Sequence, residues 1–133
     1  MSGGSIVIPV ELFLFGALGM AAPYLGRPLG LVVDVRPVTE VVDHVIPGAA
    51  VVAVALAAIV TGRRWFVACM VVVAAGLWMT ASHLPLLLQA GNGQADLGAA
   101  VFHAAPGMVI LVLGSVASVV DARAEHDEDE ALR

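Results

Sequence analysis

The chain has 133 residues, which is the length of one domain. Its 60% hydrophobic residues, 13% charged residues and mean hydropathy of +0.98 exclude an ordinary soluble globular protein and indicate a protein of the lipid bilayer. The chain has no lysine, and its six basic and eleven acidic residues leave a net charge of −5, which excludes the basic surface that nucleic-acid binding requires.

Four segments are predicted to cross the bilayer as helices, because a crossing needs about 20 mostly apolar residues. They run from about Ile6 to Leu25, Glu40 to Gly62, Trp65 to Leu88 and Leu97 to Val120. The first is the weakest, because Pro9, Glu11 and Pro23 interrupt its apolar run. We therefore expect an all-α, integral membrane four-helix bundle over residues 1–120.

The segments outside these helices carry other patterns. The connector from Gly26 to Thr39 contains an apolar patch, LGLVV, that is too short to cross a bilayer. We expect it to lie along the membrane surface, with an extended loop as the alternative. The stretch AGNGQAD is typical of a turn. The acidic residues 121–133, DARAEHDEDEALR, are expected to form a solvated, disordered C-terminal tail.

Arginine placement predicts the orientation of the chain in the membrane. Four arginines fall on the side of the termini and two on the other: Arg63, Arg64, Arg123 and Arg133, against Arg27 and Arg36. Because cytoplasmic loops carry the excess of basic residues, we expect both termini in the cytoplasm, with the bacterial inner membrane as the location.

The two halves of the chain repeat each other at a fixed offset, the one that separates His44 from His103. Aligned without gaps, they share about eleven identities, where this composition gives roughly five by chance. The scarcer matched types are Met20/Met79, His44/His103, Pro47/Pro106 and Arg64/Arg123. We therefore predict an internal duplication: two tandem helical hairpins, about 6–62 and 65–120, related by a pseudo-two-fold axis along the membrane normal.

Two short stretches, AAPYLG (Ala21 to Gly26) and ASHLPL (Ala81 to Leu86), stand at corresponding places in the halves. They resemble the SPW-repeat family of small bacterial membrane proteins, in which each repeat is a two-helix unit with a Ser-Pro-Trp-like signature at the end of its first helix. The first stretch keeps a proline and an aromatic residue, whereas the second shifts the proline and lacks the aromatic residue. The resemblance covers most of the chain and implies a fold without an assigned reaction.

Three of the four histidines fall near the face of the predicted bundle that is opposite to the termini: His44, His83 and His103. Neutral imidazole is a common ligand of transition metals and of haem iron, so a metal or haem b site is one interpretation. Glu40 stands four residues before His44 and can share its helix face, as a further ligand or as a partner of one. The alternative is that these histidines bond water, lipid headgroups or carbonyl groups, since no denser metal-binding pattern is present.

Other singled-out residues have structural interpretations. Pro47, Gly48, Pro106 and Gly107 are predicted to serve helix packing. Proline fits the first turn of a helix or kinks its interior, and glycine lets a neighbouring helix approach. Glu11, an acid within an apolar segment, is a candidate charge site or a side chain that reaches water at the membrane surface.

Three functions stay open at this point. The first is non-enzymatic assembly, as a homo-oligomer or an accessory subunit that packs against other membrane proteins through an outward stripe of glycine and alanine. The second is a haem- or metal-binding redox protein that uses His44 and His103, with His83 as a third candidate. The third is a small transporter or lipophile-binding protein with a cavity between the repeats, where Glu11 or Glu40 handles charge. No pattern supports an enzyme, and no catalytic residue is predicted.

Overall fold

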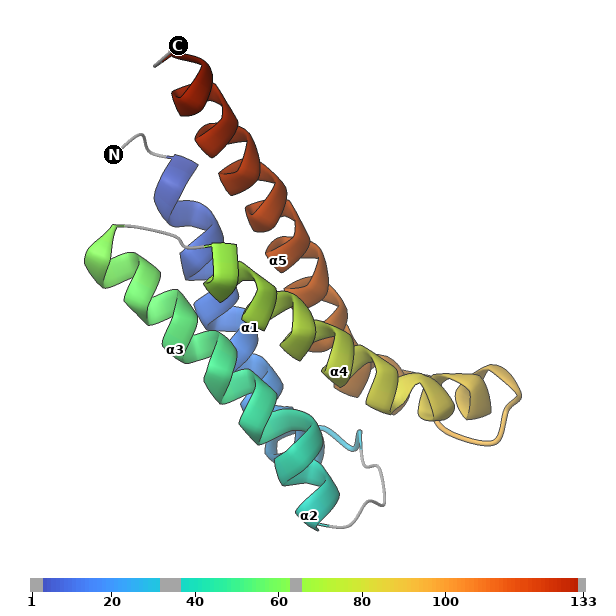
Figure 1. Cartoon of the computed structure of the whole chain (residues 1–133). Coiled ribbons are helices and arrows are strands. Elements are labelled where there is room, and N and C mark those ends of the chain that lie inside the picture. Colours follow the sequence, from blue (N-terminus) through green and yellow to red (C-terminus); the bar gives the residue numbers. More distant parts are fainter. Residues whose placement is uncertain (1–3, 32–36, 63–65, 132–133) are drawn as a thin grey trace.

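A computed structural model describes residues 4–31, 37–62 and 66–131 of the chain, which form a bundle of helices (Figure 1). Its four long helices are α1 (Gly4–Gly26), α3 (Ile46–Thr61), α4 (Phe66–Gly91) and α5 (Leu97–Ala131). Directly before α3 come a single turn, α2 (Pro37–Glu40), and a π-helical turn, η1 (Val41–Val45). The described residues contain no strand, so the prediction of an all-α four-helix bundle is confirmed.

The helices of this bundle are long and apolar enough to cross a membrane. Four spans have this property in the described part of the chain: Val7–Gly26, Val38–Thr61, Phe66–Gly91 and Leu97–Arg123, with mean hydropathies between 1.6 and 2.2. A helix satisfies its own backbone hydrogen bonds, which is what hydrocarbon requires of a spanning segment. The outer surface suits lipid as well, because valines such as Val60 and Val67 are 82% and 74% exposed.

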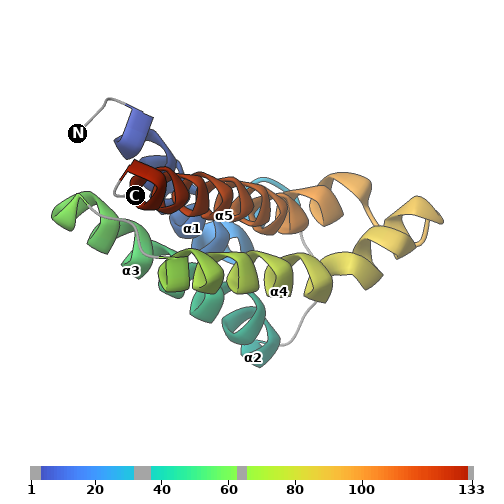
Figure 2. The same cartoon turned by 45° about the horizontal axis from the view of Figure 1, so that its top comes forward.

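Each long helix packs against two neighbours, in the order α1, α3, α4, α5 and back to α1. α4 and α5 form the most extensive pair and lie side by side in both views (Figures 1 and 2). α1 begins and α5 ends at one end of the bundle, while α2 and the turn between α4 and α5 lie at the other (Figure 1). We call this second end the polar end, because the residues of the candidate site gather there.

Glycines bring the helices close together in the middle of the bundle. A Cβ atom on Gly107 of α5 would lie 2.6 Å from the Cβ of Met79 on α4, and one on Gly76 of α4 would lie 2.5 Å from the backbone nitrogen of Leu111 on α5. Gly48 stands equally close to the side chain of Met20 on α1. Both Gly48 and Gly107 are thus at tight helix contacts, where any larger residue would push two helices apart.

The two predicted packing prolines occupy different positions. Pro47 stands at the start of α3, where its missing N–H would have no helical partner in any case. Pro106 lies inside α5, directly before the contact between Gly107 and Met79. Both prolines are buried.

The structure differs from the sequence-based expectation at the acidic tail. α5 continues without a break to Ala131, where we expected a disordered end after Val120. Once a helix is nucleated, each further residue costs little, and alanine, glutamate and arginine are good helix formers. The apolar pattern ends near Val120, but the helix does not.

Parts of two other predictions lie outside the described residues. In the connector, residues 27–30 form a turn and Leu31 donates its backbone N–H to the carbonyl of Gly26 at 2.8 Å, but residues 32–36 are not described. The orientation rule rests on arginines of which Arg36, Arg63, Arg64 and Arg133 are likewise not described. The membrane-surface connector and the cytoplasmic termini therefore stay predictions.

We expect Gly107→Ala to destabilise the bundle, because the new methyl group would overlap the Cβ of Met79 and the backbone of α4. Overpacking of this kind costs about 1–3 kcal/mol. The measurement is the free energy of unfolding in mixed micelles, followed by circular dichroism during titration with a denaturing detergent. Gly91→Ala is the matched control, since a Cβ on Gly91 meets nothing within 4 Å. Equal stability of the two variants would contradict the proposed close contact.

Candidate functional site

A cavity of about 290 Å³ lies at the polar end of the bundle. Six of its lining residues carry ionisable or amide side chains: Glu40, Asp43, His44, His83, Gln89 and His103. They come from α2, η1, α4 and α5, so segments that are far apart in the sequence meet at this cavity. Gln89 is exposed, whereas the three histidines are buried, and the cavity therefore reaches from the surface to buried imidazoles.

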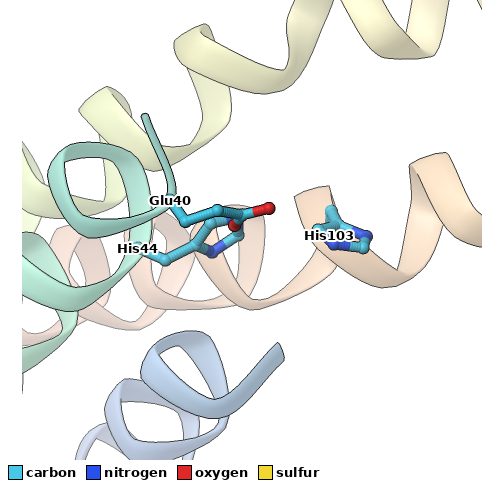
Figure 3. A group of neighbouring side chains, drawn as sticks. All are labelled: Glu40, His44 and His103. Atoms are coloured by element: carbon cyan, nitrogen blue, oxygen red, sulfur yellow. The ribbon is translucent and has the colours of Figure 1, made fainter. Parts of the chain in front are cut away.

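Glu40, His44 and His103 form the tightest group within this cavity. One ligand atom from each, a carboxylate oxygen or an imidazole nitrogen, lies within 4.8 Å of the other two. Figure 3 shows Glu40 and His44 adjacent on one segment and facing His103, which projects from α5. Two residues from one segment and one from a distant helix thus converge on a single point.

His44 has an environment that a buried imidazole seldom has. Its side chain is 1% exposed, and neither ring nitrogen has a partner with hydrogen-bond geometry among the described residues, although the backbone carbonyl of Gly19 on α1 lies near the ring. Its Nε2 lies 3.8 Å from Oε2 of Glu40, which is too far for a hydrogen bond, and that oxygen is also buried without a partner. A buried polar group without a partner costs about 1–3 kcal/mol, so this arrangement requires an explanation.

The other two histidines are oriented by their own helices. Nδ1 of His83 lies 2.7 Å from the carbonyl oxygen of Met79, and Nδ1 of His103 lies 2.9 Å from that of Ala99. A carbonyl oxygen only accepts, so each Nδ1 carries the proton and donates it, which assigns the tautomer. Each Nε2 is then left with a lone pair, the form in which imidazole binds a metal ion.

The π-helical turn explains why His44 differs. His83 and His103 each bond the carbonyl four residues earlier, which is how such a ring is satisfied in an α-helix. In η1 the backbone N–H of Ile46 donates to the carbonyl of Val41, five residues earlier, so the turn is wider. His44 lies in this wider turn, and its ring makes no hydrogen bond to the carbonyl four residues earlier.

The three imidazole rings form a compact triangle. The ring centroid of His44 lies 4.4 Å from that of His83 and 5.6 Å from that of His103, and the centroids of His83 and His103 are 6.2 Å apart. α1 closes one side of this triangle, because a Cβ on its last residue, Gly26, would lie 3.5 Å from Cε1 of His103. The rings are thus enclosed by helices on the side of α1.

Four candidate residues from the sequence meet in this cavity: Glu40, His44, His83 and His103. Glu11 lies outside it, half-buried on α1 and toward the opposite end of the bundle. The sequence analysis assigned no role to Asp43, Ser82 or Gln89, which also line the cavity. Asp43 and Ser82 directly precede His44 and His83, so adjacency to a histidine was the signal that could have pointed to them.

The donor set determines which chemistry this arrangement can support. Imidazole nitrogens and a carboxylate oxygen together are a ligand set for zinc and for other divalent transition metals. Magnesium and calcium prefer oxygen ligands alone, so they fit this set poorly. Among the described residues that line the cavity, the one hydroxyl next to a histidine, that of Ser82, donates to the carbonyl of Met79 at 3.1 Å. The same hydroxyl lies 3.1 Å from Nδ1 of His83, so it is already in contact with two partners, and the donor set of the cavity is one that can hold an ion.

Comparison of the chain with protein-family models, with curated proteins and with solved structures finds no match in any of the three.

Proposed function

We propose that this membrane protein binds one divalent transition-metal ion at its polar end, with Glu40, His44 and His103 as ligands. The observation that carries the proposal is the His44 side chain, 1% exposed and with no hydrogen bond to either ring nitrogen among the described residues. A metal ion supplies the missing partner for one of these nitrogens and for the buried oxygen of Glu40 at the same time. The ion-free bundle carries the free-energy cost of these unpartnered polar atoms. Binding of the ion removes this cost, so it adds to the affinity for the metal.

The distances in the site suit a single ion. Donor atoms bound to zinc at 2.0–2.1 Å in a tetrahedral arrangement are about 3.3 Å apart. The three ligand atoms here lie within 4.8 Å of one another, so a closure of about 1–1.5 Å brings them to bonding distance. Side-chain rotation supplies a movement of that size without a shift of the helices.

Haem fits this site less well than a single ion. Two axial histidines must face each other across a flat slot that is wide enough for the porphyrin ring. The carboxylate of Glu40 lies within 4.8 Å of both His44 and His103, and the ring of His83 stands 4.4 Å from that of His44. These two side chains occupy the slot, so we favour a metal ion over haem as the ligand.

Assembly with further copies or with other membrane proteins stays an alternative proposal. It was expected to use small residues on an outward face. The glycines Gly16, Gly19, Gly48, Gly76, Gly107 and Gly114 instead contact other helices of the same chain. Their packing does not support the assembly alternative.

The transporter alternative shares the cavity of the metal site. It requires that an ion pass on through the bundle, beyond the three ligands. Toward the other end of the bundle the helix core consists of apolar side chains such as Leu12, Val51 and Val72. This core favours a protein that holds its ion over one that conducts it.

The duplication, the SPW-repeat resemblance and the bacterial inner-membrane location with cytoplasmic termini also stand as proposals. Two contacts support the duplication. Gly48 abuts Met20 and Gly107 abuts Met79, and these two pairs are related by the same offset as His44 and His103. A duplicated hairpin with parallel orientation would bring equivalent histidines to one end of the bundle, which is where both lie.

We expect the purified protein to bind one Zn²⁺ per chain. Glu40→Gln and His103→Gln should each weaken binding by more than the roughly 10–100-fold that loss of a ligand's hydrogen-bond partner costs. The measurement is isothermal titration calorimetry in detergent, with metal analysis after dialysis. Matched controls are Glu11→Gln, an acid in an apolar span outside the cavity, and His126→Gln, the histidine of the acidic C-terminal stretch. A wild-type protein that binds no transition metal, or controls that lose as much affinity as the two variants, would refute the proposal.

His44→Leu separates a ligand from a structural histidine. In the metal-free protein, we expect this change to raise the free energy of unfolding by about 1–3 kcal/mol, because it removes buried polar atoms that lack partners. Wild-type protein should gain about 2.7 kcal/mol in Zn²⁺ at 100 times the Kd, and the variant should gain much less at the same Zn²⁺ concentration. The measurement is unfolding in mixed micelles with chelator or with Zn²⁺. A less stable variant in chelator would show that the imidazole of His44 stabilises the bundle by itself.

A further inference from the structure

The ring of His83 lies beside the proposed ligands but outside the group of three whose atoms lie within 4.8 Å of one another. It lines the same cavity, is 8% exposed, and its centroid is 4.4 Å from that of His44. On the basis of the metal binding proposed above, we infer that His83 is the fourth ligand. The ion is then held by three imidazoles and one carboxylate in a tetrahedral arrangement, which is the preference of Zn²⁺.

The triangle of rings has the dimensions of such a site. With a metal to nitrogen distance of 2.0–2.1 Å, the centroid of a bound imidazole lies about 3 Å from the ion. Two imidazoles at the tetrahedral angle then have centroids about 5 Å apart. The three measured separations, 4.4, 5.6 and 6.2 Å, lie on both sides of this value. One ion can therefore reach all three rings after small side-chain rotations.

The hydrogen bonds of His83 prepare it for this role. Its Nδ1 donates to the carbonyl of Met79 at 2.7 Å, and the hydroxyl of Ser82 lies 3.1 Å from the same nitrogen. The proton is thus held on Nδ1, so Nε2 carries the lone pair. His103 is held in the same tautomer by Ala99. Metal-binding histidines are typically oriented by a bond from their second nitrogen to a carbonyl or carboxylate.

Four protein ligands have a consequence for function. Catalytic zinc sites keep one position open for water or substrate, whereas structural sites are filled by protein side chains. With Glu40, His44, His83 and His103 all bound, no position is left for a reacting molecule. The bundle then acts as a holder of Zn²⁺ in the membrane, in which the ion ties α2 and η1 to α4 and α5.

Cobalt substitution tests the fourth ligand directly. Tetrahedral Co²⁺ absorbs visible light strongly, while Co²⁺ with five or six ligands absorbs weakly. We expect the strong absorption in the Co²⁺ form of wild-type protein and in His126→Gln, and a band of altered position and intensity in His83→Gln, because water then replaces one imidazole as the fourth ligand. The same variant should bind Zn²⁺ more weakly by a factor above the roughly 10–100-fold that loss of a ligand's hydrogen-bond partner costs, as the other two ligand variants do. Excess Mg²⁺ should not displace Co²⁺ from the wild-type protein.

X-ray absorption at the zinc edge gives a second measurement that needs no variant. Wild-type protein loaded with Zn²⁺ should show four light-atom ligands, three of them imidazoles. This measurement tests the inference even if His83→Gln does not fold. Two imidazoles at zinc, or a His83→Gln variant with unchanged affinity and an unchanged cobalt spectrum, would overturn the fourth ligand while the three-ligand site stands. Failure of the wild-type protein to bind Zn²⁺ or Co²⁺ would instead overturn the proposed function.

Discussion

The contact between Gly107 on α5 and Met79 on α4 determines the geometry of the polar end. Lipid supplies no hydrophobic drive that holds two helices together, so their separation depends on how closely the backbones can pack. Glycine at residue 107 lets α5 approach until the Cβ of Met79 occupies the space of a side chain. His83 follows Met79 by four residues and His103 precedes Gly107 by four. The imidazoles of His83 and His103 are therefore held across one helix interface, one turn from the contact that sets its width.

The second half of the cluster depends on a local change of helix type. Glu40 and His44 belong to the segment in which α2 passes through the π-helical turn η1 into α3. Such turns occur frequently at functional sites, since they redirect one side chain at the cost of weaker backbone geometry. In this bundle the side chain on the turn is His44, which lacks the bond to its own helix that His83 and His103 make. The weaker turn and the unsatisfied ring are two unfavourable features at one residue, and the ion of the proposed site would offset both.

Hydropathy predicted much of this architecture for a physical reason. A bilayer imposes one length on every crossing segment, so four apolar runs yield four helices and place successive turns at alternate ends. His44, His83 and His103 each lie near such a turn. The number and order of the spans therefore predict that all three lie at one end of the bundle. Distances between their rings, in contrast, depend on the depth of glycine contacts such as that of Gly107, which a linear pattern does not contain. The sequence also does not predict the π-helical turn, because a continuous apolar run has no periodicity that distinguishes a π turn from an α-helix.

The continuation of α5 to Ala131 depends on helix propensity, which polarity alone does not describe. The polar composition of residues 121–133 predicts a solvated, disordered end, whereas α5 continues past the apolar span, which ends at Arg123. A polar segment that leaves a long helix inherits its nucleus, so it needs only favourable propensity to continue. Polarity decides where a helix leaves the bilayer, and propensity decides where it ends.

Charge gives a further reason why the polar end suits a cation. The cavity is lined by two carboxylates, Glu40 and Asp43, and by three imidazoles that are neutral when they bind metal. No arginine is among its described lining residues. A buried carboxylate is costly without a partner, and one oxygen of Glu40 is buried without a hydrogen bond among the described residues, so this end of the bundle suits a cation. Of the cations, divalent transition metals are the ones that imidazole ligands favour, which agrees with the proposed site.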